Sequence, residues 1–309
     1  MKSCKGCYLY FAANLTGCAK KACEVNLELL ASKRQGNSHK VAGLNKALNN
    51  INAYCTNDGL KAELQQKIDD TNSEIEEYKA DYGKTIITAY ARIDGWSVGI
   101  IANQRKLVKN ANKEMQFGGV IYNDSADKAT RFIANCNQKK IPLVFLQDVT
   151  GFMVGSKSEH SGIIKDGAKM VNALSNSVVP KFTVIIGNSY GAGNYAMCGK
   201  AYDPRLIVAW PSAALAVMSG NSAAKVLLQI ETAALKKKGE TITPEKEAEL
   251  FDEIKSRYDE QVSPYYAAAR LWTDAVIAPT DTRNWISMGI EAANHAPIKK
   301  VFNMGVTQV

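Results

Sequence analysis

Two uninterrupted apolar runs constrain this chain most, because each leads into a segment rich in glycine. The runs are Ile141–Leu146 and Phe182–Ile186. Continuous apolar strands are typical of parallel sheets, whose two faces are both covered. The segments that follow contain Gly151 with Gly155, and Gly191-Ala192-Gly193. An order of buried strand, glycine turn and helix presents bare backbone N–H groups to an oxygen that carries negative charge.

Helical and strand patterns alternate through residues 81–309, which predicts an α/β fold built from ββα units. Asp94-Gly95 is a hairpin signal between strands at Thr85–Ile93 and Trp96–Ala102. The other expected helices are Ser125–Gln138, Ile163–Ser177, an arm at 233–259, Tyr265–Trp272 and Thr282–Asn294, and the other expected strands are Leu206–Trp210 and a short one within Asp274–Pro279. In such a fold ligands bind at the carboxyl ends of the strands.

Residues 1–80 differ from the rest and are predicted to be a separate helical domain. Five of the seven cysteines lie within the first 55 residues, and three helical patterns follow Cys18, the last running from Leu60 to Tyr78. The basic and apolar segment before Cys18 resembles a short secretory signal with a lipid-attachment box, so export is an alternative to a cytoplasmic location. A zinc site on the cysteines Cys4, Cys7, Cys18 and Cys23 is disfavoured by their spacing, and we expect no metal.

Charge and apolar content limit the classes of partner. The net charge is +8, which suits an acidic ligand, but the lysines are dispersed and no arginine-rich or aromatic-interleaved patch occurs. We therefore expect no nucleic-acid binding. No apolar run reaches the roughly 20 residues of a membrane span, so none is predicted.

Side chains offer few candidates for catalysis. The three histidines are scattered, and among them only His160 follows a strand-end glycine. No P-loop and no G-x-G-x-x-G fingerprint is present, and no Ser-His-Asp triad is predicted. Asp148 is a turn-former or orients the following loop, and Cys198 is predicted to be a buried apolar residue. Equivalent strand ends of a ββα spiral come together, so the two glycine segments are predicted to direct N–H groups into one pocket.

Residues 81–309 resemble the C-terminal half of the carboxyltransferase (beta) subunit of biotin-dependent acyl-CoA carboxylases, of the methylcrotonoyl-CoA carboxylase type. The motifs that carry the resemblance, in chain order, are Ala91–Gly95, Phe117–Ile121, Ser125–Ala129, Pro142–Gly155, Gly167–Met170, Tyr190–Gly199, Ala209–Pro211, Ala216–Met218, Ala269–Trp272 and Asp281–Arg283. The resemblance implies a crotonase-like fold and carboxyl transfer between carboxybiotin and an acyl-CoA thioester.

The resemblance also assigns roles to residues of the two glycine segments. It implies that backbone amides of Ala192 and Gly193, with Gly191, stabilise an oxyanion. It implies substrate or biotin contacts for the residues that surround them, which are Gly151, Phe152, Gly155, Tyr190, Asn194 and Tyr195. The implied partners are a biotin carboxyl carrier or biotin carboxylase subunit, acyl-CoA, and further copies of the chain in a dimer or a trimer of dimers.

Two departures from the family pattern leave alternatives open. The family's N-terminal half, which makes most acyl-CoA contacts, has no counterpart in this sequence, and Ser161 stands where glycine is usual. We therefore expect activity only with a complementary half. The alternatives are a biotin-dependent acyl-CoA decarboxylase subunit of the glutaconyl-CoA type and a non-catalytic fused or truncated protein.

Residues 15–80 resemble the YqjC-like family of small exported helical proteins. The matching segments are Cys18–Lys21, Asn37–Leu44 and Cys55–Asp58. The resemblance implies a helical hairpin pinned by a bridge between Cys18 and Cys55, and the alternative is a surface extension with free thiols.

Overall fold

The computed structural model describes Asn45, residues 75–237 and residues 243–306. The chain divides into two compact units, Met1–Glu74 and Ile75–Val309. The predicted helical hairpin, the Cys18–Cys55 bridge and the disfavoured cysteine zinc site lie outside the described residues, apart from the end of the third predicted helix. That end is wrong, because Glu76–Glu77 is a strand and not helix.

A mixed sheet of eight strands forms the centre of the second unit. Its order is β1-β2-β3-β7-β9-β10-β12, with β11 beside β9. The strands are β1 (Glu76–Glu77), β2 (Ile86–Ile93), β3 (Trp96–Asn103), β7 (Leu143–Val149), β9 (Lys181–Tyr190), β10 (Leu206–Ala209), β11 (Ala214–Ala216) and β12 (Ala275–Val276). The pairs from β3 to β12 are parallel, and β2 pairs antiparallel with both β1 and β3.

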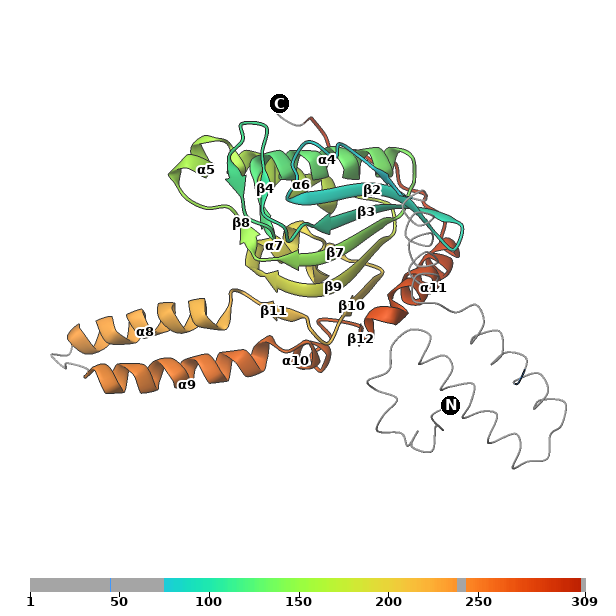
Figure 1. Cartoon of the computed structure of the whole chain (residues 1–309). Helices are drawn as coiled ribbons and strands as arrows, with labels where there is room; N and C mark the ends of the chain where they lie inside the picture. Colours follow the sequence, from blue (N-terminus) through green and yellow to red (C-terminus); the bar gives the residue numbers. More distant parts are fainter. Residues whose placement is uncertain (1–44, 46–74, 238–242, 307–309) are drawn as a thin grey trace, which may run out of the picture. The chain divides into compact units, whose positions relative to one another are not determined.

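Two small sheets and eight α-helices complete the described part of this unit (Figure 1). The small sheets pair β4 (Val108–Lys109) with β5 (Met115–Gln116), and β6 (Val120–Ile121) with β8 (Gly151–Phe152). The helices are α4 (Asn123–Gln138), α5 (Ser156–His160), α6 (Ile163–Ser175), α7 (Gly191–Ala196), α8 (Gly220–Lys237), α9 (Pro244–Val262), α10 (Pro264–Ala268) and α11 (Thr282–Asn294). None of the described helices is long and apolar enough to cross a bilayer.

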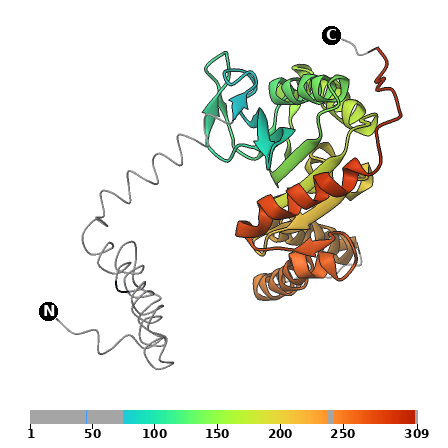
Figure 2. The ribbon, with the colours of Figure 1, turned by 90° about the vertical axis from the view of Figure 1, so that its right-hand side faces the viewer.

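Helices cover both faces of the sheet, as the apolar runs predict. Leu143 and Phe145 of β7 pack with α4 and α6, and Val144 between them packs on the opposite face. That opposite face is covered by α11 through Ile286, as Figure 2 shows for the helix. Successive side chains of a strand point to opposite faces, so a strand covered on both sides is apolar throughout.

The hairpin predicted at Asp94-Gly95 is confirmed. Both residues have positive φ, +49° and +85°, and Ile93 pairs with Trp96 across the turn. Two residues of positive φ match the twist of the flanking strands. Cys198 is fully buried, also as predicted.

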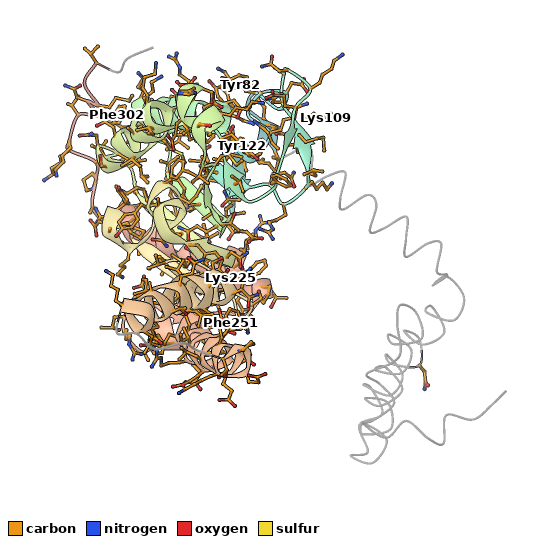
Figure 3. The ribbon with its side chains drawn as sticks, turned by 90° about the vertical axis from the view of Figure 1, so that its left-hand side faces the viewer. Tyr82, Lys109, Tyr122, Lys225, Phe251 and Phe302 are labelled. Carbon is orange, nitrogen blue, oxygen red and sulfur yellow. The ribbon has the colours of Figure 1, made fainter. Side chains whose placement is uncertain are left out.

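Helix extents differ from the sequence prediction near the C-terminus. The arm predicted at 233–259 consists of two helices, α8 and α9, which project side by side from the sheet (Figure 1). In Figure 3, Lys225 marks α8 and Phe251 marks α9. The helix predicted at Tyr265–Trp272 is shorter in the structure. It is α10, which ends at Ala268, and Leu271 beyond it has a left-handed φ of +59°.

The residues that follow α11 lie against α6. Asn172 Nδ2 donates to the Met304 carbonyl at 2.9 Å, and Met304 and Ile298 pack on the core under α4 and α6. Phe302, labelled in Figure 3, belongs to the same segment. This C-terminal segment, residues 296–304, therefore forms one wall of the surface near the start of β9.

Candidate active site

The candidate site is built where β9 runs directly into α7. The strand continues past the predicted Phe182–Ile186 to Tyr190, which caps the helix in an extended conformation. Gly191 follows with a φ of +50°, a conformation that glycine adopts at no steric cost. The first N–H groups of a helix have no intrahelical acceptor, and no side chain caps this one. The amides that open α7 are therefore available to an external acceptor.

The two glycine segments meet, as the ββα arrangement predicts. A Cβ atom on Gly193 would lie 3.2 Å from the Gly151 Cα and 2.6 Å from Val149 Cγ2. A Cβ on Gly191 would lie 2.8 Å from the Val217 carbonyl oxygen. The absence of side chains at both positions therefore lets α7 lie directly on β8 and on the residues after β11.

A buried network of side-chain amides and a hydroxyl holds α7 in place. Asn194 Nδ2 donates to Ser189 Oγ, and Ser189 Oγ donates to Gln147 Oε1, each at 2.7 Å. Gln147 Nε2 donates to the Met197 carbonyl at 2.7 Å, so the network joins β7 and β9 to Asn194 within α7 and to Met197 just after it. Gln147 and Ser189 were not predicted from the sequence. The sequence signal that could have found them is that each is a polar residue close to the end of an apolar strand.

Asp148 lies within β7, and its carboxylate contacts β9 and Arg105 rather than the loop that follows it. Its Oδ1 accepts from the Asn188 N–H at 2.9 Å, and its Oδ2 pairs with Arg105 Nε at 3.2 Å. A Cβ on Gly187 would lie 2.5 Å from Asp148 Oδ1, so the carboxylate packs directly on the β9 backbone. Asp148 therefore ties the ends of β7 and β9 together where their register shifts, between the pairs Gln147–Ile185 and Val149–Ser189.

A cavity of about 430 Å³ opens beside α7. Three predicted residues line it, namely Gly191, Asn194 and Tyr195. The opposite wall comes from α9 and from residues at and after α10, including Tyr258, Tyr266 and Trp272. No sequence pattern indicated that the arm contributes here, because these residues lie more than 60 positions after Gly191. Ala192 and Gly193 are not among the lining residues. An aromatic wall combined with a few polar side chains is typical of a small-molecule site.

The two predicted tyrosines have different surroundings. Tyr190 is half-buried, and burial, then the nearby Asp259, raises the pKa of its phenol. Tyr195 is 51% exposed and makes an edge contact with Tyr202, with ring centroids 6.0 Å apart. Tyr195 is therefore the one of the two whose ring is free to meet an incoming group.

The structure separates Phe152 from this cavity. Phe152 packs on α6, where a Cβ on Gly167 would lie 3.0 Å from its ring, and it lines a second cavity of about 410 Å³. That second cavity is apolar and is flanked by the exposed side chains of Val154 and Ile164. Gly155 has a φ of +105° and begins α5 with open space around it. Of the three residues predicted in this segment, Gly151, Phe152 and Gly155, it is Gly151 whose backbone packs against Gly193 of α7.

Titratable side chains contribute little at α7. His160 is exposed at the end of α5 rather than in a loop, and it lines neither cavity. Within residues 75–237 and 243–306, no three His, Cys, Asp or Glu side chains gather as metal ligands. Burial raises the pKa of the Cys198 thiol to about 11, so it is not a nucleophile near neutral pH. Lys200 also lines the cavity beside α7, and its ammonium group pairs with Asp274 at 3.0 Å.

The carboxyl transferase domain profile matches residues 57–304. The chain belongs to the carboxyl transferase domain family. The chain is 45% identical over 229 residues to the biotin-dependent 3-methylcrotonyl-coenzyme A carboxylase beta1 subunit of Mycobacterium tuberculosis, covering 74% of this chain and 41% of that protein. It is 47% identical over 227 residues to the mitochondrial methylcrotonoyl-CoA carboxylase beta chain of Arabidopsis thaliana, covering 74% and 36%.

Solved structures of this family share the fold. The geranyl-CoA carboxylase beta subunit of P. aeruginosa matches with a TM-score of 0.62 and 37% identity, covering 76% of this chain and 42% of that chain. The transcarboxylase 12S structure matches with a TM-score of 0.62 and 36% identity, covering 75% and 42%. The crotonase-like fold predicted for residues 81–309 is confirmed. The chain spans about two fifths of the length of these relatives.

Proposed function

We propose that this chain is the biotin-side half of a carboxyltransferase that moves a carboxyl group between carboxybiotin and an acyl-CoA thioester. The observation that carries the proposal is the start of α7, whose first N–H groups have no side-chain cap. This helix packs on β8 through Gly193, and the hydrogen-bond network of Gln147 holds it in place. The carboxylase subunits among the relatives support the reaction class.

The reaction needs fixed hydrogen-bond donors more than a strong base. Carboxybiotin would supply the carboxyl group, and its ureido nitrogen, once it has lost that group, would accept the acyl proton. Negative charge would thus develop on the ureido oxygen and then on a thioester oxygen. The amides of Ala192 and Gly193 would donate to such an oxygen, and each preorganised donor contributes about 3 kcal/mol to transition-state stabilisation. Asn194 and Ser189 would keep the amides aligned, and the aromatic wall would exclude water.

The cavity beside α7 fits a compact bicyclic group such as the biotin ring system. Its volume of about 430 Å³ is within the range of small-molecule sites. Tyr258, Tyr266 and Trp272 give it an aromatic wall, whereas Ser189, Asn194 and Lys200 supply polar side chains. Tyr195 and Tyr190 would contact the same ligand, and Gly151 would support the amides that bind it.

A complementary half would complete the site from the side of the second cavity. The apolar surface around Phe152 includes Val154 and Ile164, whose side chains are 77% and 72% exposed. Exposed apolar patches of this kind mark interaction surfaces. We propose that an acyl-CoA-binding half docks on this surface, and that Gly155 allows the loop there to adapt. The complete enzyme would be a homo-oligomer in the cytoplasm that binds a biotin carboxyl carrier. The related transcarboxylase 12S protein assembles as a hexamer.

The reverse direction is a second candidate function. The chain is 37% identical over 215 residues to the methylmalonyl-CoA decarboxylase subunit alpha of Propionigenium modestum. The same donors would serve carboxyl transfer from an acyl-CoA to biotin, because each direction passes through the same charge distribution. The direction of carboxyl transfer is tested by running the assay below with a carboxylated acyl-CoA and a biotinylated carrier whose biotin carries no carboxyl group.

The test is transfer of a labelled carboxyl group from carboxybiotinylated carrier to a panel of acyl-CoA thioesters. The full chain is assayed alone and with a separately expressed N-terminal half of a methylcrotonoyl-CoA carboxylase beta subunit. We expect transfer only in the mixture. No transfer in either case, together with no affinity for biotinylated carrier, would contradict the proposal and favour a non-catalytic protein.

A further inference from the structure

A cationic groove lies at the end of the sheet opposite α7. It has a volume of about 720 Å³ and is formed by the end of α6, the start of β9, the residues before β10 and the C-terminal segment. Its charged lining residues are Lys181, Asp203, Arg205, Lys299 and Lys300. Lys181 is the first residue of β9 and Tyr190 is the last, so the usual rise per residue places the groove about 30 Å from α7.

The positive charges of the groove are not paired with carboxylates. Four cationic side chains line it and Asp203 is the one acidic residue among the lining, so the groove carries a formal charge of +3. None of the four forms an ion pair within the described ranges. Elsewhere in the same unit cations do find partners, as Lys200 does with Asp274 at 3.0 Å. The groove is therefore an uncompensated concentration of positive charge.

Lys181 is the most unusual of these cations because it is buried. The residue as a whole is only 8% exposed, and it lines the groove without an ion pair in the described part of the chain. Burial, as the largest effect, and the nearby Arg205 both lower the pKa of this group. An anion bound in the groove would lie beside this desolvated cation and would offset part of the cost of its burial.

The backbone holds the cationic side chains around the groove. The Arg205 N–H donates to the Lys181 carbonyl at 2.7 Å, which fixes these two residues side by side. Neutral donors nearby are already used: Ser177 Oγ and the Val178 N–H both donate to Asn137 Oδ1. Binding in the groove would therefore depend on the charged groups.

We propose that this groove binds a small polyanion, a molecule that carries two or more phosphoryl or carboxylate groups. The buried Lys181 would contact one anionic group, and the exposed Arg205, Lys299 and Lys300 would contact the others. An arginine fork binds either group through two parallel hydrogen bonds, which favours Arg205 as the orienting contact. The volume admits a molecule of metabolite size rather than a folded partner. This site is separate from the carboxyl transfer proposed at α7.

The test is calorimetric titration of the full chain with tripolyphosphate and, separately, with tricarballylate, at constant ionic strength. Constant ionic strength keeps the screening of charges the same throughout the titration, so the measured heat does not reflect a general salt effect on a basic protein. We expect saturable binding of at least one probe, and the tighter one identifies the anionic group. The exposed double variant Lys299→Gln/Lys300→Gln should weaken binding by at least about tenfold, since hydrogen bonds to charged groups are lost. The control Lys225→Gln, on the exposed surface of α8, should leave it unchanged.

Lys181→Gln provides the buried test. It should abolish detectable binding, because it removes the least exposed of the four cations that line the groove. Lys181→Arg keeps the charge and should retain part of the affinity. Failure of both probes to bind saturably would overturn the proposal. Equal affinities for the wild type and the Lys299→Gln/Lys300→Gln variant would also overturn it.

Discussion

The two ends of β9 differ in how they present positive potential. At the carboxyl end the donors are neutral amides of α7, fixed by Gly193 packing and by the Gln147 network. At the amino end they are unpaired side-chain cations around Lys181. Neutral, rigid donors suit charge that appears only in a transition state, because they cost no reorganisation when it forms. Full charges suit an anion that is present before and after binding. We therefore propose that one strand positions two kinds of anion site.

The largest expected effect comes from removing one amide at the carboxyl end. Ala192 is exposed and occupies the first turn of α7, where proline is tolerated and its missing N–H breaks no helical bond. Ala192→Pro should lower the carboxyl-transfer rate by about 100- to 1000-fold in the presence of a complementary half. Ala192→Ser keeps the N–H and is the matched control. Equal rates for the two variants would refute catalysis by this amide.

A second effect concerns the packing that brings the two glycine segments together. Gly193→Val places new atoms against Val149 and Gly151, so we expect a loss of about 1–3 kcal/mol in the free energy of unfolding. Ala192→Val adds the same side chain at an exposed position and should change that free energy by less than about 1 kcal/mol. Denaturant unfolding compares the two. Similar values would mean that α7 does not depend on close contact with β8.

The hydrogen-bond network should have a smaller effect on stability. Ser189→Ala leaves Gln147 Oε1 and Asn194 Nδ2 without a partner in the interior, which costs about 1–3 kcal/mol. Carboxyl transfer should fall as well, because Asn194 no longer holds α7. Ser212→Ala removes an exposed hydroxyl and serves as the control. Thermal unfolding and transfer assays are read together, and loss of stability without loss of rate would limit the network to a structural role.

The smallest expected effect is at the ion pair beside the site. Arg105 is about half exposed, and exposed pairs contribute roughly 0–1 kcal/mol. Arg105→Met should therefore change the free energy of unfolding by less than about 1 kcal/mol, since Asp148 still accepts from Asn188. Urea unfolding measures this directly. A larger loss would show that the pair, and not the backbone contact, sets the register of β7 and β9.

Local pattern was sufficient for much of this fold. The apolar runs at Ile141–Leu146 and Phe182–Ile186 predicted central strands, and their glycine segments predicted where α7 and β8 meet. Each of those features is encoded within a few neighbouring residues, so periodicity and turn chemistry revealed it.

Features built from distant segments could not be predicted in the same way. The aromatic wall needs Tyr258 and Trp272 to fold back over α7, and the cationic groove joins Lys181 to Lys299. Polar residues such as Gln147 and Ser189 were missed because their partners lie about 40 positions apart. Phe152 was assigned to the pocket at α7 by resemblance, whereas its ring packs on Gly167 of α6.

The most direct measurement is amide NMR of the full chain during titration with biocytin, the lysine conjugate of biotin. If α7 supplies backbone donors to the biotin group, the amide signals of Ala192 and Gly193 should shift in a saturable manner, and that of Lys181 should not. Tripolyphosphate should give the opposite pattern. Saturating biocytin that leaves the amides of Ala192 and Gly193 unshifted would contradict a biotin site at the start of α7.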